Sequence, residues 1–186
     1  MKKIFLPFLF CLIVFTSCNK TLAVPHNEEL AQVLAGTWEL SQLSTAEYHP
    51  DESNPDIILG ILTFESITRQ KFLPQQVFET TLQTNFVSFD FAIKDSSITE
   101  EDLRNAVNQE VIIYGKYFVN NSTITIANEY VSVDGGEKIL YKDFLMENPM
   151  MGSPVQTMTW KISGNMLSYF ITVDGQDLEV TYKKSN

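Results

Sequence analysis

The feature that most constrains the fold is a series of short strand-like segments in the second half of the chain, separated by tight-turn sequences. Within each segment apolar and polar residues alternate, which is typical of a half-buried strand. The breaks supply the positive φ angles that tight hairpins need. Consecutive hairpins predict an antiparallel meander. The breaks lie at Asn120-Asn121, Asp134-Gly135-Gly136, Ser163-Gly164-Asn165 and Asp174-Gly175.

The first half of the chain carries further strand-like segments. One begins at Thr37, directly after a glycine, and others cover residues 58–64 and 70–80. Pro74 interrupts the last of these. Because proline cannot donate a hydrogen bond to a neighbouring strand, it predicts a bulge or a sheet edge.

Apolar residues at every second position predict the inward faces. Residues 86–94 alternate most regularly, and two further rows lie near the C-terminus. The rows expected to face inward are Val87, Phe89, Phe91 and Ile93; Met158, Trp160 and Ile162; and Leu167, Tyr169 and Ile171.

A closed barrel is the fold class that this pattern favours. We expect an all-β, antiparallel up-and-down barrel of about 8–10 strands, because closure removes the exposed edges of a long open sheet. A two-sheet sandwich is the alternative. Two helices are expected: a short N-terminal helix over residues 28–34, capped by Asn27, and a helix inserted between strands within 97–108, capped by Thr99, which three acidic residues follow.

The N-terminus has the pattern of a processing signal. Lys2-Lys3 precedes an apolar run, residues 4–15, that is too short for a permanent membrane span. The sequence Phe15-Thr16-Ser17-Cys18 resembles the lipobox of bacterial lipoproteins. The resemblance implies that Cys18 receives a diacylglycerol and an acyl chain such as palmitate. It also implies three regions: a signal peptide over 1–17, a lipidated tether over 18–27 and a barrel domain over 28–186.

The residue after Cys18 indicates the membrane that holds the anchor. Asn19 is not the aspartate that resembles an inner-membrane retention signal, so we expect an anchor in the outer membrane of the cell envelope, on either face.

Charge and cysteine content limit the kinds of partner that the protein can bind. The formal net charge of −10 disfavours nucleic acid and anionic headgroups as partners. Cys11 lies in the signal and Cys18 is the lipid site, which leaves no thiol in the barrel domain for disulfide, metal or redox chemistry.

Four segments of the chain carry a family resemblance: residues 34–40, 62–66, 114–119 leading into 123–126, and 160–167. In this order and spacing they resemble bacterial lipocalin-like lipoproteins of the Bacteroidetes type, within the calycin superfamily. The resemblance implies that Gly36 and Trp38 close one end of the barrel, with a basic side chain across the tryptophan ring. The family's arginine is missing, so Lys183 or Lys184 is expected to take its place. Trp38 is then a structural plug rather than a ligand contact.

Aromatic residues make up 12% of the chain, and for any one of them core packing is the usual role. An eight-stranded barrel can also be wide enough to hold a small apolar ligand. The segment 146–154 contains three methionines and is expected to plug the barrel rather than to form a portal. The ligand-binding candidates are Phe64, Phe89, Phe91, Tyr117, Met158, Trp160, Tyr169 and Met150.

Nucleophilic triads, phosphate-binding glycine patterns and paired histidines are not found in the sequence. Its two histidines, His26 and His49, have no metal-ligand spacing. A carboxylate pair assembled across strands leaves no local motif and stays open. We expect no enzyme activity, no metal and no cofactor.

The leading hypothesis is an outer-membrane-anchored barrel that binds a small hydrophobic or amphipathic ligand. The alternative is a non-enzymatic protein- or glycan-interaction module that uses rim segments 45–56 and 146–154.

Overall fold

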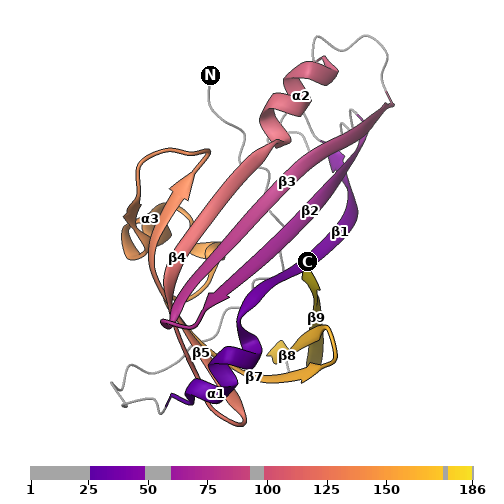
Figure 1. The fold of residues 1–186 in the computed structure, drawn as a ribbon. Helices are drawn as coiled ribbons and strands as arrows, with labels where there is room; N and C mark the ends of the chain where they lie inside the picture. The colour runs from indigo at the N-terminus through magenta and orange to yellow at the C-terminus, as the bar shows by residue number, and fades with distance from the viewer. Residues whose placement is uncertain (1–25, 49–59, 93–98, 174–175, 186) are drawn as a thin grey trace.

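A closed antiparallel barrel of eight strands forms the centre of the structure (Figure 1). The computed structural model describes residues 26–48, 60–92, 99–173 and 176–185. The sheet order is β4-β3-β2-β1-β9-β8-β7-β5-β6, and the pairing of β4 with β5 closes the ring. β6 pairs with β5 beside the ring. The predicted fold class is confirmed, and closure of the ring excludes the two-sheet sandwich.

The strands are β1 (Gly36–Tyr48), β2 (Gly60–Leu73), β3 (Val77–Phe91), β4 (Gln109–Val119), β5 (Thr123–Val133), β6 (Ile139–Leu140), β7 (Val155–Ser163), β8 (Met166–Val173) and β9 (Gln176–Ser185). The helices are α1 (Glu28–Leu34), α2 (Glu100–Val107), α3 (Tyr141–Glu147) and the 3-10 turn η1 (Pro149–Met151).

Some predicted features lie outside the described residues. They are the signal segment with Cys18, most of the tether and of the rim segment 45–56, His49, Ile93 and the turn Asp174-Gly175. In the part of the chain that is described, no helix is long and apolar enough to cross a membrane.

The barrel wall is long on one side and short on the other. β1 pairs with β2 over its whole length, from Gly36 to Tyr48, but with β9 only at Thr37–Glu39. β5 likewise meets β7 only over residues 123–127. Strands β1 to β4 therefore form a long curved wall, while β7, β8 and β9 form a shorter one near α1, as Figure 1 shows.

Helix α1 closes one end of the barrel. Asn27 caps it as predicted, because its side chain accepts a 3.1 Å hydrogen bond from the Leu30 N–H. Trp38, only 1% exposed, follows the helix closely in β1. Its Nε1–H donates a 2.8 Å hydrogen bond to the Leu34 carbonyl. The tryptophan thereby satisfies one of the carbonyls that a helix C-terminus leaves unpaired.

Helix α2 covers the opposite end. Thr99 and Asp102 form a capping box: the Asp102 N–H donates to Thr99 Oγ1 at 3.1 Å, and the Thr99 N–H donates to Asp102 Oδ2 at 2.9 Å. Hydrogen bonds from the Thr99 side chain and backbone lower the pKa of Asp102. The helix predicted here is confirmed. Its buried residues Leu103 and Val107 share a cluster with the inward side chains Leu62, Phe86 and Phe89.

The prediction of a bulged or edge strand at residues 70–80 is wrong. β2 ends at Leu73, and Pro74 lies in the turn that leads into β3. In this turn Gln76 has a φ of 65°, and its carbonyl accepts a 3.0 Å hydrogen bond from the Tyr117 N–H. Proline is tolerated in this turn, because the turn position does not require the backbone N–H that proline lacks.

The inward position predicted for Val87 is also wrong. Ser88 and Phe86 take consecutive pairing positions opposite β2, so the intervening Val87 has no opposite residue. A bulge of this kind shifts the alternation of the residues beyond it by one. Val87 is consequently 48% exposed, whereas Phe86 is buried.

The segment 146–154, expected to plug the barrel, begins inside the helix α3. Tyr141, Phe144 and Leu145 recur at the helical spacing i, i+3 and i+4 of α3, a period that the strand-based interpretation overlooked. Tyr141 and Phe144 are buried, and Met151 of η1 is partly buried in the same cluster, whereas Met146 is exposed. The helix packs against the inward side chains Leu82, Val111, Ile113 and Val131.

Candidate functional site

The barrel end that α1 closes is a packed apolar core. Phe72, Phe78 and Tyr117 are almost fully buried there, and the rings of Phe72 and Tyr117 make a T-shaped contact with centroids 5.0 Å apart. The Tyr117 hydroxyl donates a 2.9 Å hydrogen bond to the Leu73 carbonyl. The structure thus places the ligand-binding candidate Tyr117 in the closed-end core.

Gly36, Trp38 and Lys184 meet at this end. Lys184 Nζ lies 5.1 Å from the centroid of the Trp38 ring, while Lys183 pairs with Glu39 in the β1–β9 register. Gly36 has a φ of +127°, and a Cβ atom there would lie 3.0 Å from Lys184 Cε. A side chain at this position would strain the backbone and push against the lysine.

Three aromatic candidates gather at the α2 end. Phe64 is partly buried against the cluster that contains Phe89. The rings of Phe89 and Phe91 make a T-shaped contact with centroids 4.6 Å apart, and Phe91 is 38% exposed. This end of the interior is therefore aromatic, with Phe91 at its solvent-facing margin.

The candidates of β7 and β8 lie on the shorter wall. Tyr169 is buried, and Met158 and Trp160 are partly buried against the closed-end core. The Trp160 Nε1–H donates a 3.0 Å hydrogen bond to the Asn120 carbonyl. The side chain of the last candidate, Met150, lies outside those that the structure describes.

A band of buried polar side chains lies between the two apolar ends of the barrel. The β2–β3 register places Ser66 opposite Thr84 and Gln70 opposite Thr80 on the inner face. Together with Thr68 they form what we call the inner polar band, in which no residue is more than 8% exposed. The sequence prediction followed the apolar rows and missed this band. Its signal was the alternation of polar residues at positions 66, 68 and 70.

One member of the band is tied to the opposite wall. The Tyr169 hydroxyl donates a 2.7 Å hydrogen bond to Gln70 Oε1. Burial, together with the nearby Tyr182, raises the pKa of Tyr169 well above its usual value. The hydroxyl therefore stays protonated and remains a hydrogen-bond donor at physiological pH.

Two members of the band are left without partners. Thr68 Oγ1 and Thr84 Oγ1 are buried, and neither has a hydrogen-bond partner among the described residues. The two threonines lie on neighbouring strands and face the same side, because Thr68 pairs with Leu82, two residues before Thr84. A buried polar group left unpaired costs about 1–3 kcal/mol, so most buried hydroxyls in proteins are bonded.

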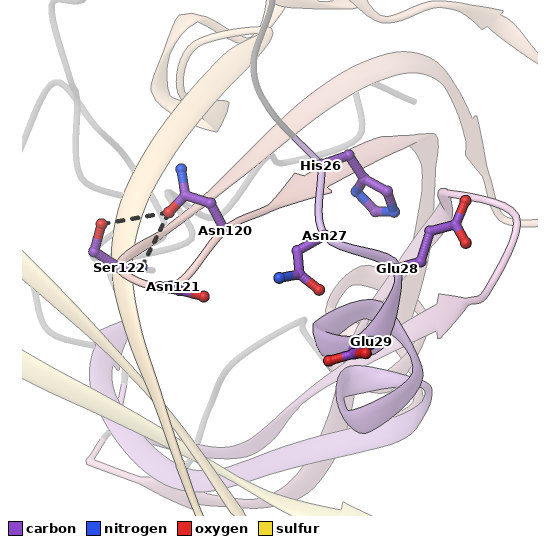
Figure 2. A pocket seen from close by; sticks show the side chains of 7 residues that line it. All are labelled: His26, Asn27, Glu28, Glu29, Asn120, Asn121 and Ser122. Carbon is purple, nitrogen blue, oxygen red and sulfur yellow. Dashed lines mark hydrogen bonds between the residues drawn. The ribbon is translucent and has the colours of Figure 1, made fainter.

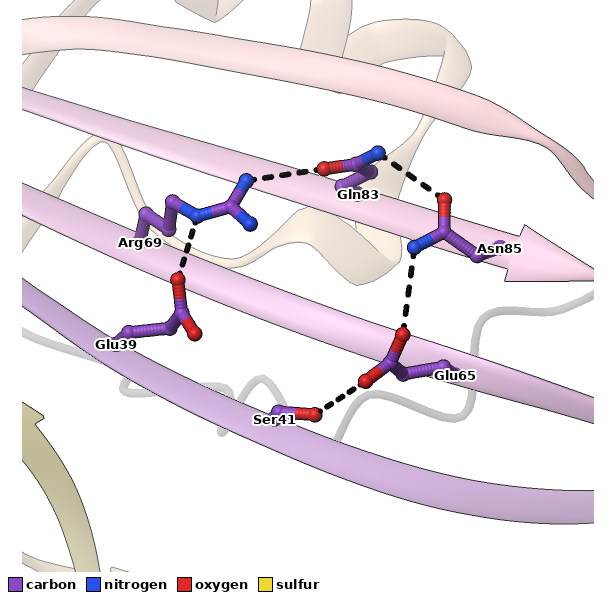
Figure 3. A network of polar contacts seen from close by, with 6 residues as sticks. All are labelled: Glu39, Ser41, Glu65, Arg69, Gln83 and Asn85. Carbon is purple, nitrogen blue, oxygen red and sulfur yellow. Dashed lines mark hydrogen bonds and ion pairs between the residues drawn. The ribbon is translucent and has the colours of Figure 1, made fainter. Parts of the chain in front are cut away.

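The barrel wall is uncharged on the inside and charged on the outside. Among the described residues, every buried polar residue is a serine, threonine or glutamine. Charged residues of β1 and β2 lie on the outer face, in the network that Figure 3 shows. There Arg69 Nε donates to Glu39 Oε2 at 2.6 Å and Arg69 Nη1 donates to Gln83 Oε1 at 3.0 Å. The network continues through Asn85, Glu65 and Ser41.

An open pocket of about 760 Å³ lies outside the closed end, between the start of α1 and the β4–β5 turn (Figure 2). His26 Nδ1 accepts a 3.4 Å hydrogen bond from the Val119 N–H, and Nε2 is buried without a partner in the described chain. Asn120 Oδ1 accepts hydrogen bonds from Ser122 and Thr123. The pocket is lined by His26, Asn27, Glu28, Glu29, Asn120, Asn121 and Ser122.

No known family model matches the chain, and no curated protein matches its sequence. Its class therefore follows from its architecture: a closed antiparallel barrel of eight strands with a few short helices, consistent with a lipocalin-like barrel. Within the described ranges, no group of three or more His, Cys, Asp or Glu side chains could hold a metal ion.

Proposed function

We propose that this protein is a lipid-anchored, lipocalin-like barrel of the bacterial outer membrane that binds a small hydrophobic or amphipathic molecule and catalyses no reaction. The observation that carries the binding proposal is the pair of buried, unpartnered hydroxyls of Thr68 and Thr84 on the inner wall. The interior of an eight-stranded barrel is just wide enough to be filled by side chains or to hold one small ligand.

The two hydroxyls support binding because they are costly in a barrel that is only a packed core. Apolar groups of the same shape would fill the same space without the desolvation penalty of an unpaired hydroxyl. Functional sites often contain residues that lower the stability of the folded protein. A few polar groups within a mostly apolar lining are also the usual composition of small-molecule sites.

The proposed anchor rests on the sequence alone, through Lys2-Lys3, the apolar run and Phe15-Thr16-Ser17-Cys18. Two or three acyl chains at Cys18 hold a protein stably on a membrane, because each buried methylene contributes about 0.8 kcal/mol. The tether 18–27 spans at most roughly 35 Å when extended. The barrel would therefore stay close to a membrane, which is a source of hydrophobic and amphipathic molecules.

The binding proposal is tested by extracting the purified full chain with organic solvent and analysing the released small molecules by mass spectrometry. The double variant Thr68→Val/Thr84→Val, purified in parallel, is the matched control. We expect the parent protein to release an amphipathic compound in near-stoichiometric amount and the variant to release less of it. Identical lipid profiles for the parent, the variant and an unrelated lipoprotein would contradict the proposal.

The anchor is tested separately by metabolic labelling with palmitate. We expect the full chain to be labelled and to fractionate with the outer membrane, and the Cys18→Ser variant to lose both properties. Labelling that persists in the Cys18→Ser variant would rule out Cys18 as the lipid site.

A further inference from the structure

We infer that the ligand is an uncharged amphiphile with a hydroxyl head group, which lies at the inner polar band while its apolar part extends toward the α2 end. This inference rests on the proposed ligand-binding function and adds the chemical class of the ligand and its direction in the barrel.

The chemistry of the band selects an uncharged head group. The Thr68 and Thr84 hydroxyls can each donate one hydrogen bond and accept others, so they match a group that does both, such as an alcohol. A carboxylate or phosphate at the same depth would need a positive partner. In the described residues no basic side chain is buried. Lys184 lies at the closed end, and Arg104 of α2, which lies 4.7 Å from the centroid of the Phe86 ring, is 48% exposed. An unpaired buried charge costs far more than an unpaired hydroxyl.

The packing on either side of the band sets the direction of the apolar part. Toward α1, the space is filled by the closed-end core around Trp38 and Phe72. Toward α2, the inner wall is lined by apolar side chains that pack under the helix, and it ends at Phe91, which is 38% exposed. On the β4–β5 side the interior is filled by Tyr141 and Phe144 of α3. The α2 end is thus the direction in which an alkyl chain follows an apolar wall toward a solvent-facing margin.

The two hydroxyl oxygens have almost no accessible surface. A head group therefore reaches them only when neighbouring side chains shift, which is a common kind of rearrangement on binding. The hydrogen bonds gained with the ligand offset this rearrangement, because both hydroxyls change from unpaired to paired.

The test is a competition assay on the full chain held in amphipol, with amphipol alone as the blank. The neutral fluorescent probe N-phenyl-1-naphthylamine is displaced at pH 8 by dodecan-1-ol, dodecanoate or dodecane. We expect dodecanol to bind at least tenfold more tightly than dodecanoate and more tightly than dodecane. Thr68→Val and Thr84→Val should each weaken dodecanol binding three- to tenfold, the range that one hydrogen bond of about 0.7–1.4 kcal/mol gives.

Two variants keep the test specific. Thr81→Val changes a threonine of β3 that faces outward, and it should leave dodecanol affinity unchanged. Thr68→Ser retains the hydroxyl and should restore most of the affinity that Thr68→Val loses. Thermal unfolding of each variant shows that it is folded.

The outcomes separate this inference from the proposed function. If dodecanoate or dodecane binds as tightly as dodecanol, the barrel binds ligands but the head-group assignment is wrong. Equal dodecanol affinity in the parent and both valine variants would also overturn it. If neither the probe nor any of the three compounds binds, ligand binding itself fails, and the inference falls with it.

Discussion

Replacement of Thr68 and Thr84 by valine should make the ligand-free protein more stable. Valine keeps the branched shape of threonine and the tendency to form strands, but removes a buried hydroxyl that has no partner among the described residues. Each substitution removes a penalty of about 1 kcal/mol, the lower end of the range for an unpaired buried polar group. The double variant should therefore gain about 2 kcal/mol in the free energy of unfolding, or about 4–8 °C in Tm for a domain of this size.

This stabilisation is measured by urea and thermal unfolding after extraction of bound small molecules, because a bound ligand would itself stabilise the parent protein. Thr81→Val is the control on the outer face of β3, and its effect should stay within about 0.5 kcal/mol. A double variant that is less stable than the parent protein would refute the reasoning. It would mean that the hydroxyls are satisfied in solution and that the inner polar band is structural.

Further predictions concern the closed end, α3 and the bulge. Trp38→Ala should lower the free energy of unfolding, measured by urea denaturation, by about 3–5 kcal/mol, because it leaves a cavity and removes the hydrogen bond to the Leu34 carbonyl. A larger effect on dodecanol affinity than on stability would contradict the structural role of Trp38. Burial raises the pKa of Tyr141 to about 12, so the stability that the protonated hydroxyl contributes is complete below pH 10 and is lost as the pH rises from 10 to 12. Tyr141→Phe should reduce this loss of stability at alkaline pH by up to about 1.4 kcal/mol per pH unit. If the free energy of unfolding of the variant had the same pH dependence as that of the parent protein, this prediction would be wrong. Val87→Ser should change the free energy of unfolding by less than about 0.5 kcal/mol, whereas Phe86→Ser should lower it by about 3 kcal/mol or more. If thermal unfolding showed Val87→Ser to be the more destabilising of the two variants, the result would argue against the bulge.

Much of the fold could be predicted because its signals are local. The Asn27 and Thr99 caps depend on hydrogen bonds to residues only three positions away, and both are present in the structure. The turns at Asn120-Asn121 and Ser163-Gly164-Asn165 likewise follow from the residues within them. Local preferences of this kind do not depend on which strands are neighbours.

The candidate site was less predictable, because inward direction depends on pairing between strands. The alternation in residues 86–94 suggested Val87 as an inward residue, but the bulge opposite β2 shifts the pattern by one position. The helical spacing in 141–147 was visible in the sequence, yet its packing inside the wall depends on β3, β4 and β5 coming together.

The sequence by itself predicted an antiparallel barrel and two capped helices, and its resemblance to lipocalin-like proteins implied that Trp38 closes one end. Periodicity, caps and turns act within a few residues, so they can be read without coordinates. Only the tertiary structure decided that the inner wall carries a band of uncharged polar groups, and that the Thr68 and Thr84 hydroxyls in it have no partner among the described residues. Whether a buried hydroxyl is satisfied depends on atoms from other strands, and those are brought to it only when the chain has folded.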